Sequence, residues 1–219
     1  RTTHLENFVQ CGKRLTAHLL SCTMDVTTRT GQSTGMGANL PPGTAALCGA
    51  DTEDTNVTKK KIGVLGAGTW GMALARMLCV SGNEVQVWSA LPAEVDSLSA
   101  ARVHPNLPGM KIPAELQFTK SIEEVCTGKD VLLFAVPSVF VRSTTAKARP
   151  YIPDGQILVD VAKGMEPDTL YTMTEVIADE LNREGGPKGV KLVALSGPTH
   201  AEEVALDMPT TIVSACPDE

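Results

Sequence analysis

The sequence predicts a doubly wound α/β fold built on a mostly parallel β-sheet. Two observations predict it: short apolar segments recur from residue 61 to residue 215, and amphipathic helical patterns separate several of them. Strands that are apolar along their whole length are typical of a parallel sheet covered by helices on both faces. Right-handed crossovers then bring the strand-to-helix loops to one edge of the sheet, where folds of this class bind their ligands.

The predicted elements follow one another in a regular order. Strands are expected at residues 61–65, 84–88, 116–119, 131–136, 157–161, 192–195 and 211–215. A helical spacing of Ala73, Met77 and Val80 follows the first strand, and the clearest helical pattern runs from Asp168 to Asn182. Strands that alternate with helices in this way predict an α/β domain rather than an all-β or all-helical one.

Residues 1–58 differ from residues 59–219 in composition and in hydrophobic periodicity. They lack sustained periodicity, and their second half is rich in threonine, glycine, proline and aspartate. We therefore expect a disordered or non-native tail at residues 1–58, to which no function is assigned, and one ordered domain at residues 59–219. A targeting segment is the alternative for the tail, although Asp51 and Asp54 count against a transit peptide. Because the chain begins with Arg1, we expect it to be processed or to be a fragment.

The composition excludes several classes of protein. The formal net charge is −6 and aromatic residues make up 4% of the chain, so no nucleic-acid partner is expected. No apolar run approaches the roughly 20 residues of a membrane-spanning helix, so no membrane span is expected. The six cysteines are scattered, without a Cys-x-x-Cys pair or a histidine at metal-binding spacing. This pattern predicts no metal site and a reducing, cytoplasmic setting.

A glycine-rich loop carries the strongest signal in the chain. The segment Gly66-Ala67-Gly68-Thr69-Trp70-Gly71 is a full G-x-G-x-x-G that follows a predicted strand and opens a predicted helix. In this motif the first glycine permits a tight turn, the second lets a pyrophosphate approach the backbone, and the third lets the helix pack closely. The free N–H groups of the helix N-terminus attract the phosphates. The motif predicts a Rossmann dinucleotide site, and the alternative is a glycine-rich turn without a ligand.

The second predicted strand leaves the choice between NAD and NADP open. An acidic residue about 20 positions after the motif normally binds the ribose 2′-hydroxyl of NAD. Here the strand ends in Trp88-Ser89-Ala90-Leu91, with no carboxylate and no arginine for a 2′-phosphate. The hydroxyl of Ser89 could hydrogen-bond either cofactor.

Two later loops at the same edge are candidates for an anionic substrate. Thr199 and Glu202 have capping-box spacing, so Thr199 is expected to cap a helix, and Gly197 leaves backbone N–H groups open to an anion. Lys163 follows another strand, where an ammonium could bind a substrate phosphate or polarise a carbonyl. The alternatives, an ordinary capped helix and a solvated lysine, stay open at this point. His200, in a first helical turn, is assigned a structural role because the helix dipole disfavours an imidazolium there.

These segments together resemble the NAD(P)-dependent glycerol-3-phosphate dehydrogenases of the bacterial type. The resemblance runs from about residue 60 to the last residue and does not include residues 1–58. Each motif alone is weak, but their order is specific. The motifs are the glycine loop, Asn106-Leu107-Pro108-Gly109, Ala135-Val136-Pro137-Ser138, Lys163-Gly164-Met165-Glu166-Pro167 and Leu195-Ser196-Gly197-Pro198-Thr199-His200-Ala201-Glu202-Glu203.

The resemblance implies an activity and a set of contacts. It implies reversible hydride transfer between NAD or NADP and dihydroxyacetone phosphate, with sn-glycerol 3-phosphate supplied to phospholipid synthesis. The implied substrate contacts are Lys163, Gly197 and Thr199. The implied cofactor contacts are Gly66, Gly68, Thr69, Trp70, Gly71, Ala90, Phe140, Lys163 and Ala201. The complete family enzyme is expected to be a homodimer.

Three departures from the family pattern limit what can be carried over. Asn106 replaces an aromatic residue, and Ala90 and Leu91 replace a basic or histidine pair after the second strand. The chain stops at Glu219, where the helical domain that carries the family's general-acid lysine is expected to begin. No catalytic residue is therefore assigned here, and Lys163 is expected to bind rather than to donate a proton. The alternative functions are a non-catalytic dinucleotide-binding or redox-sensing module and a related dehydrogenase for another carbonyl compound.

Overall fold

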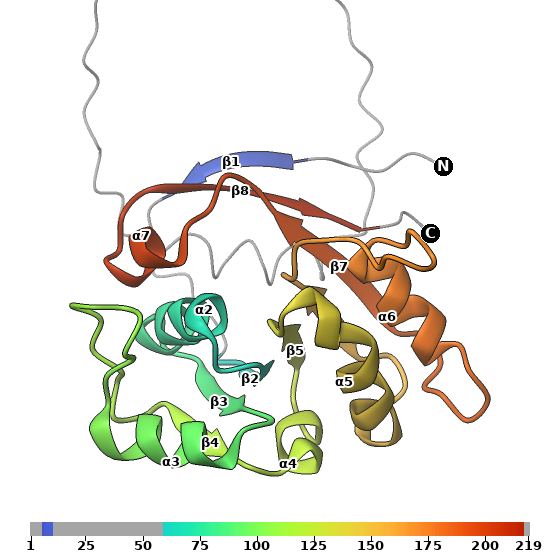
Figure 1. The fold of residues 1–219 in the computed structure, drawn as a ribbon, viewed down its shortest axis with the longest axis horizontal. Helices are drawn as coiled ribbons and strands as arrows, with labels where there is room; N and C mark the ends of the chain where they lie inside the picture. The colour runs from blue at the N-terminus through green and yellow to red at the C-terminus, as the bar shows by residue number, and fades with distance from the viewer. Residues whose placement is uncertain (1–5, 11–58, 217–219) are drawn as a thin grey trace, which may run out of the picture.

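The computed structural model describes residues 6–10 and 59–216, which form an eight-stranded sheet with helices on both faces (Figure 1). The strands are β1 (Glu6–Gln10), β2 (Lys61–Leu65), β3 (Glu84–Trp88), β4 (Gln117–Thr119), β5 (Val131–Phe134), β6 (Ile157–Asp160), β7 (Lys191–Ser196) and β8 (Thr210–Ala215). Their order across the sheet is β1-β8-β7-β6-β5-β2-β3-β4. All pairs between β4 and β7 are parallel, which confirms the predicted doubly wound, mostly parallel α/β fold.

The central strands are buried on both faces because helices cover both. In β5, Val131 and Leu133 belong to one hydrophobic cluster, while Leu132 and Phe134 belong to the other. The first cluster contains residues of α2 (Thr69–Val80), α3 (Pro92–Ala101) and α7 (Ala201–Ala205). The second contains residues of α4 (Ile122–Cys126), α5 (Val141–Ala148) and α6 (Met173–Leu181). Two short 3-10 turns, η1 (Ser138–Phe140) and η2 (Arg149–Tyr151), flank α5.

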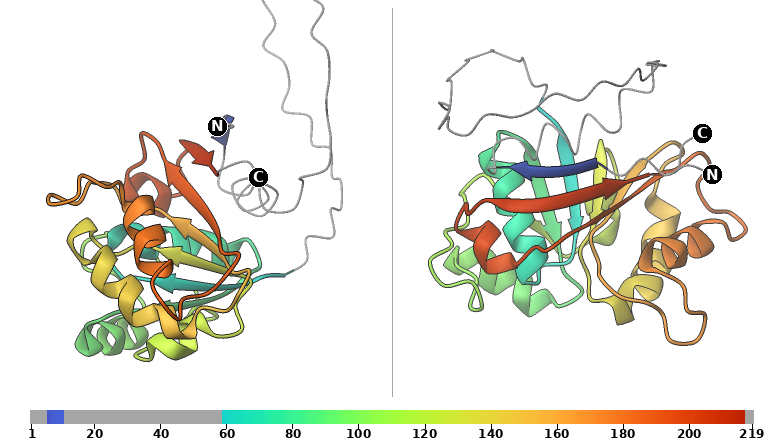
Figure 2. Two further views of the ribbon diagram at one scale, coloured as in Figure 1. Left: turned by 90° about the vertical axis from the view of Figure 1, so that its right-hand side faces the viewer. Right: turned by 90° about the horizontal axis from the view of Figure 1, so that it is seen from above.

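The last strand departs from the parallel pattern. β8 runs antiparallel to β7, and the two strands lie side by side in both views of Figure 2. The connection from β7 to β8 contains only the five-residue helix α7, and the chain turns back at the edge where β7 ends. Helix length alone does not explain this turn, because α4 is also five residues long and leads into the parallel strand β5. A bidentate pair of Arg76 with Asp207, at 2.8 and 2.9 Å, ties this turn to α2.

Helix α6 begins later than the sequence predicts. The helical pattern was expected to start at Asp168, but the helix begins at Met173. The reason is a capping box: the Thr172 side chain accepts a hydrogen bond from the Glu175 N–H, and the Glu175 carboxylate accepts one from the Thr172 N–H. Leu170, with a φ of 58°, also lies outside the helical region.

The predicted tail at residues 1–58 is described only over β1. This strand pairs antiparallel with β8, from Glu6 opposite Ser214 to Gln10 opposite Thr210, and the sequence did not predict it. The rest of the predicted tail and residues 217–219 of the predicted domain lie outside the described residues. Within the described ranges, no helix has the length and apolar character needed to cross a membrane.

Candidate functional site

The loop between β2 and α2 packs so closely that two of its positions require glycine. Gly66 has a φ of 122°, and a Cβ there would lie 2.6 Å from the carbonyl oxygen of Ala135 at the end of β5. A Cβ on Gly71 would lie 2.2 Å from the carbonyl oxygen of Gly66. The glycines therefore hold the loop against the neighbouring strand and the helix against the loop.

The same loop is open where a ligand would approach it. A Cβ on Gly68, the N-cap residue of α2, would have no atom within 4 Å. No side chain caps this helix, so the N–H groups of its first turn have no side-chain partner at the positive end of the helix dipole. The buried indole N–H of Trp70 also has no acceptor among the described residues. Such an arrangement of unpaired donors fits the diphosphate of a dinucleotide.

The end of β3 lies directly beside the glycine loop. The Gly66 N–H donates to the Trp88 carbonyl oxygen at 2.9 Å. Ser89 follows as a buried residue, and Ala90 is exposed. The residues directly after the strand carry no carboxylate, but Glu94 of α3 reaches this strand end, where the Ser89 hydroxyl donates to its carboxylate at 2.5 Å. The sequence signal for it was Pro92, which starts α3 and thereby turns Glu94 of the first helical turn back toward the strand.

The structure brings the three predicted substrate-binding residues together. Lys163, after β6, donates from its ammonium to the Gly197 carbonyl oxygen at 2.9 Å and to the Thr199 hydroxyl at 3.1 Å. Gly164 and Gly197 have φ values of 142° and 141°, which side chains other than glycine rarely adopt. The lysine thereby lies at the carboxyl edge of the sheet, within a cluster of polar oxygens.

One expectation for this second loop was wrong. Thr199 does not cap α7, because the N-cap residue is His200 and no side chain caps that helix. The buried Thr199 hydroxyl contacts Lys163 instead, which the capping-box spacing with Glu202 could not reveal. His200 itself is exposed at the N-cap, one residue before the first turn to which the sequence assigned it.

The remaining predicted cofactor contacts lie near this edge but differ in exposure. Phe140 lies in η1, after β5, and is 55% exposed. Ala201, the first residue of α7, is buried in the hydrophobic cluster that α7 shares with α2. Its side chain thus packs the helix against the core, and its contact with a cofactor stays a prediction.

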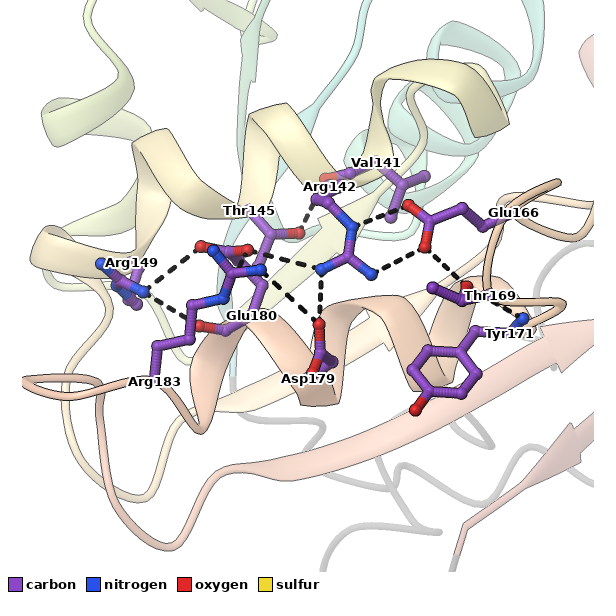
Figure 3. A network of polar contacts seen from close by, with 10 residues as sticks. All are labelled: Val141, Arg142, Thr145, Arg149, Glu166, Thr169, Tyr171, Asp179, Glu180 and Arg183. Atoms are coloured by element: carbon purple, nitrogen blue, oxygen red, sulfur yellow. Dashed lines mark hydrogen bonds and ion pairs between the residues drawn. The ribbon is translucent and has the colours of Figure 1, made fainter.

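A network of ion pairs holds the segment that carries Lys163 (Figure 3). Arg142 of α5 forms a bidentate pair with Glu166, at 2.7 Å for both bonds, and also contacts Asp179 of α6. The hydrogen bonds from Arg142 lower the pKa of Glu166 to about 2. Glu180, with 3% of its side chain exposed, lies between Arg149 and Arg183 at 3.2 Å from each. Most of these partners lie far apart along the chain, so the sequence did not indicate their contacts, whereas Glu180 and Arg183 are three residues apart, a spacing at which helical side chains meet.

A buried carboxylate fixes the start of the same segment. Asp160, the last residue of β6, accepts hydrogen bonds from the Ala162 N–H at 3.0 Å and from the Thr174 hydroxyl at 2.8 Å. Burial raises its pKa, and these two hydrogen bonds oppose the rise. Asp160 therefore links the strand end, the Lys163 loop and α6. Within the described ranges, no group of three or more potential metal ligands gathers to form a metal site.

Comparison with known protein families identifies the family to which the chain belongs. A family model described as the N-terminus of NAD-dependent glycerol-3-phosphate dehydrogenase matches residues 61–219. The chain belongs to this glycerol-3-phosphate dehydrogenase family. The resemblance drawn from the glycine loop and the later motifs is thereby confirmed.

Curated glycerol-3-phosphate dehydrogenases match the same part of the chain. Glycerol-3-phosphate dehydrogenase (NAD(P)+) 2 from Lactobacillus delbrueckii subsp. bulgaricus is 71% identical over 159 residues, which are 73% of this chain and 47% of that protein. A glycerol-3-phosphate dehydrogenase (NAD(P)+) from Geobacter metallireducens is 43% identical over 162 residues, with 73% and 47% covered. The chain therefore spans about half the length of these relatives.

Solved structures of glycerol-3-phosphate dehydrogenases share the fold. The crystal structure of the enzyme from Coxiella burnetii superposes with a TM-score of 0.60 at 31% identity, covering 68% of this chain and 44% of that one. A UDP-glucose dehydrogenase from Pyrobaculum islandicum superposes with a TM-score of 0.53 at 20% identity, covering 66% and 38%. The second likeness concerns the fold alone.

Proposed function

We propose that residues 59–219 form the cofactor-binding domain of an NAD(P)-dependent glycerol-3-phosphate dehydrogenase. The reaction is hydride transfer between a nicotinamide and the pair dihydroxyacetone phosphate and sn-glycerol 3-phosphate. One observation carries the proposal: Lys163 contacts both Gly197 and Thr199 at the sheet edge that also holds the open glycine loop. Family membership and the names of the curated relatives support the same reaction.

Each group at this edge has a proposed task. Gly66, Gly68, Thr69, Trp70 and Gly71 hold the cofactor diphosphate, because the uncapped first turn of α2 offers N–H groups and a positive dipole. The bound nicotinamide supplies the hydride chemistry. Ala90 lies on the adenosine side, Phe140 lies on the nicotinamide side, and Ala201 contacts the cofactor.

The substrate end of the site is cationic. Lys163, Gly197 and Thr199 bind the substrate and orient its carbonyl, and the ammonium favours negative charge that develops on the carbonyl oxygen. Lys163 also touches the cofactor in this proposal. The general-acid lysine implied by the family resemblance has no counterpart in this sequence, so the proton donor is proposed to come from outside these 219 residues.

The setting of the protein is also a proposal. We place it in the reducing cytoplasm, where it supplies glycerol phosphate to phospholipid synthesis and works as a homodimer when complete, without a nucleic-acid partner. The described cysteines Cys79, Cys126 and Cys216 are free thiols, which suits a reducing compartment. Burial raises the pKa of Cys126 to about 12, so this thiol is a core residue rather than a nucleophile.

The second candidate function is a dinucleotide-binding or redox-sensing module without catalysis. The open glycine loop supports it as well, but such a module needs no substrate-phosphate site at Lys163. Two measurements separate the candidates: titration of the 219-residue chain with NADH and NADPH, and turnover of dihydroxyacetone phosphate by the full-length protein. We expect the 219-residue chain to bind dinucleotide and to reduce dihydroxyacetone phosphate little or not at all. We expect the full-length protein to reduce dihydroxyacetone phosphate. Absence of dinucleotide binding contradicts both candidates, and a full-length protein that binds cofactor without turnover supports the module.

A further inference from the structure

A carboxylate of helix α3 lies at the end of the strand next to the glycine loop. The Gly66 N–H donates to the Trp88 carbonyl oxygen at 2.9 Å, so the residues after β3 lie next to the loop proposed to hold the cofactor diphosphate. In Rossmann folds the adenosine ribose lies at the end of this second strand of the motif. The group found there decides between a ribose 2′-hydroxyl and a 2′-phosphate.

Ser89 holds the Glu94 carboxylate in place. Its buried hydroxyl accepts a hydrogen bond from the Leu91 N–H at 3.1 Å and donates its own proton to Glu94 Oε2 at 2.5 Å. Glu94 is intermediate in exposure rather than buried, so part of its surface is open to solvent. An ionised carboxylate has about four acceptor sites, and the Ser89 hydroxyl occupies one of them.

The charges around this strand end disfavour a phosphate. The N-terminus of α3 has no side-chain cap and would attract an anion, but Glu94 in its first turn already complements the helix dipole. Two cations of the neighbouring elements are engaged elsewhere. Lys120 pairs with Asp96 at 2.6 Å, and Arg102 donates to the carbonyl oxygens of Pro113 and Leu116.

We infer that Glu94, aimed by Ser89, makes this site select NAD over NADP. The Glu94 carboxylate accepts a hydrogen bond from the ribose 2′-hydroxyl of NAD and repels the 2′-phosphate of NADP, which carries close to two negative charges. The inference rests on the proposed function, because it requires that the glycine loop binds a dinucleotide. Glu94 acts here as a specificity-determining residue, and Ser89 acts through it as a positioning residue.

The neighbouring strand offers a matched control. At the end of β4 the Thr119 hydroxyl accepts from the Ser121 N–H at 3.0 Å and donates to Glu124 at 2.5 Å. This hydroxyl–carboxylate pair has the same sequence spacing as the pair of Ser89 and Glu94, but β4 lies one strand further from the glycine loop, at the end of the sheet. Glu124→Gln therefore removes the same charge from the same local structure, away from the proposed ribose position.

The test is calorimetric titration of the 219-residue chain with NADH and with NADPH at low salt, where charge effects are least screened. We expect the wild-type chain to bind NADH about tenfold or more tightly than NADPH. Glu94→Gln keeps an acceptor for Ser89 and removes the charge, so it is expected to reduce that ratio about tenfold. Glu124→Gln is expected to change the ratio by less than about twofold. Circular dichroism verifies that each variant is folded.

The possible outcomes separate this inference from the proposed function. A wild-type chain that binds neither dinucleotide contradicts both. Equal binding of the two, or tighter binding of NADPH, overturns the inference and leaves the proposed function intact. An unchanged ratio in Glu94→Gln, or an equal change in Glu124→Gln, also overturns it. If Glu94→Gln does not fold, Ser89→Ala releases the carboxylate without removing it, and a ratio that does not fall about threefold overturns the inference.

Discussion

The ammonium of Lys163 lies 3.1 Å from the hydroxyl of Thr199, although the two residues belong to loops that follow different strands. The Thr199 carbonyl oxygen, at 3.4 Å, and the Gly197 carbonyl oxygen, at 2.9 Å, accept from the same ammonium. The parallel order of β6 and β7 places both loops at one edge of the sheet, so the contact follows from the topology.

Replacement of Lys163 by alanine is expected to weaken substrate binding and turnover together. The loss of a charged donor at the proposed phosphate and carbonyl position lowers kcat/KM for dihydroxyacetone phosphate by about 10- to 100-fold in the full-length protein. The exposed Lys191, at the opposite end of a strand in the same sheet, provides the control, and Lys191→Ala is expected to leave the kinetics unchanged. Unchanged kinetics in Lys163→Ala would identify the lysine as a solvated surface residue.

Two glycines of the loop are expected to respond differently to alanine. Gly68 has a φ of −65° and a ψ of 176°, which alanine adopts readily, and its Cβ would enter open space. Gly68→Ala is therefore expected to change the free energy of unfolding by less than about 0.5 kcal/mol, while dinucleotide affinity falls about tenfold.

Gly71→Ala is the counterpart of that substitution. Its Cβ would lie 2.2 Å from the Gly66 carbonyl oxygen, so the helix must move away from the loop. We expect a loss of about 2–3 kcal/mol in the free energy of unfolding. Urea denaturation of both variants measures the change in the free energy of unfolding, and NADH titration of the folded variants measures the change in affinity. Equal destabilisation by the two substitutions would contradict the structure of the loop.

The ion pair of Arg142 with Glu166 predicts a dependence of stability on pH. The hydrogen bonds from Arg142 lower the pKa of Glu166 from its ordinary value of 4.5 to about 2. A depressed pKa in the folded state means that the stabilisation is complete above pH 4.5 and is lost as the pH falls toward 2. Glu166→Gln should therefore destabilise the chain more at pH 6 than at pH 3.5.

Urea denaturation at these two pH values measures that difference. The exposed Glu184 serves as the control, because Glu184→Gln removes a carboxylate from outside the network of Figure 3. A Glu166→Gln effect that is equally large at both pH values would contradict the proposed linkage.

Glu180 is expected to be the most important carboxylate of the network for stability. It is almost fully buried and contacts Arg149 and Arg183 at 3.2 Å, so its removal leaves Arg149 without a carboxylate partner among the described residues, while Arg183 keeps a longer contact with Asp179. Because these arginines are partly exposed, we expect Glu180→Ala to lower the free energy of unfolding by about 2–3 kcal/mol. Asp179→Ala removes a more exposed carboxylate and is expected to cost about 0–1 kcal/mol. A larger effect of Asp179→Ala than of Glu180→Ala would show that burial does not decide how much each carboxylate contributes to the free energy of unfolding.

Local patterns in the sequence were sufficient for strands β2 to β8, the alternation of strands with helices and the glycine loop, but not for β1. Apolar runs such as residues 62–65 and 131–134 are buried along their whole length, which predicts helices on both sides of a parallel sheet. The G-x-G-x-x-G motif predicts its own geometry because the φ of Gly66 and the contact at Gly71 exclude side chains. The sequence alone therefore determined the fold class, the likeness to the dehydrogenase family and the residues that form the candidate site.

Only the tertiary structure decided how distant groups meet. Capping-box spacing predicts a capping role for Thr199, and the residues after β3 show no carboxylate, because the contact of Thr199 with Lys163 depends on two loops and that of Glu94 with Ser89 on the turn into α3. The antiparallel course of β8 likewise emerges only from its pairing with β7 in the sheet. The physical reason is common to all three: a side chain's partner is set by the packing of strands and helices around it, and neither residue type nor spacing encodes that packing locally.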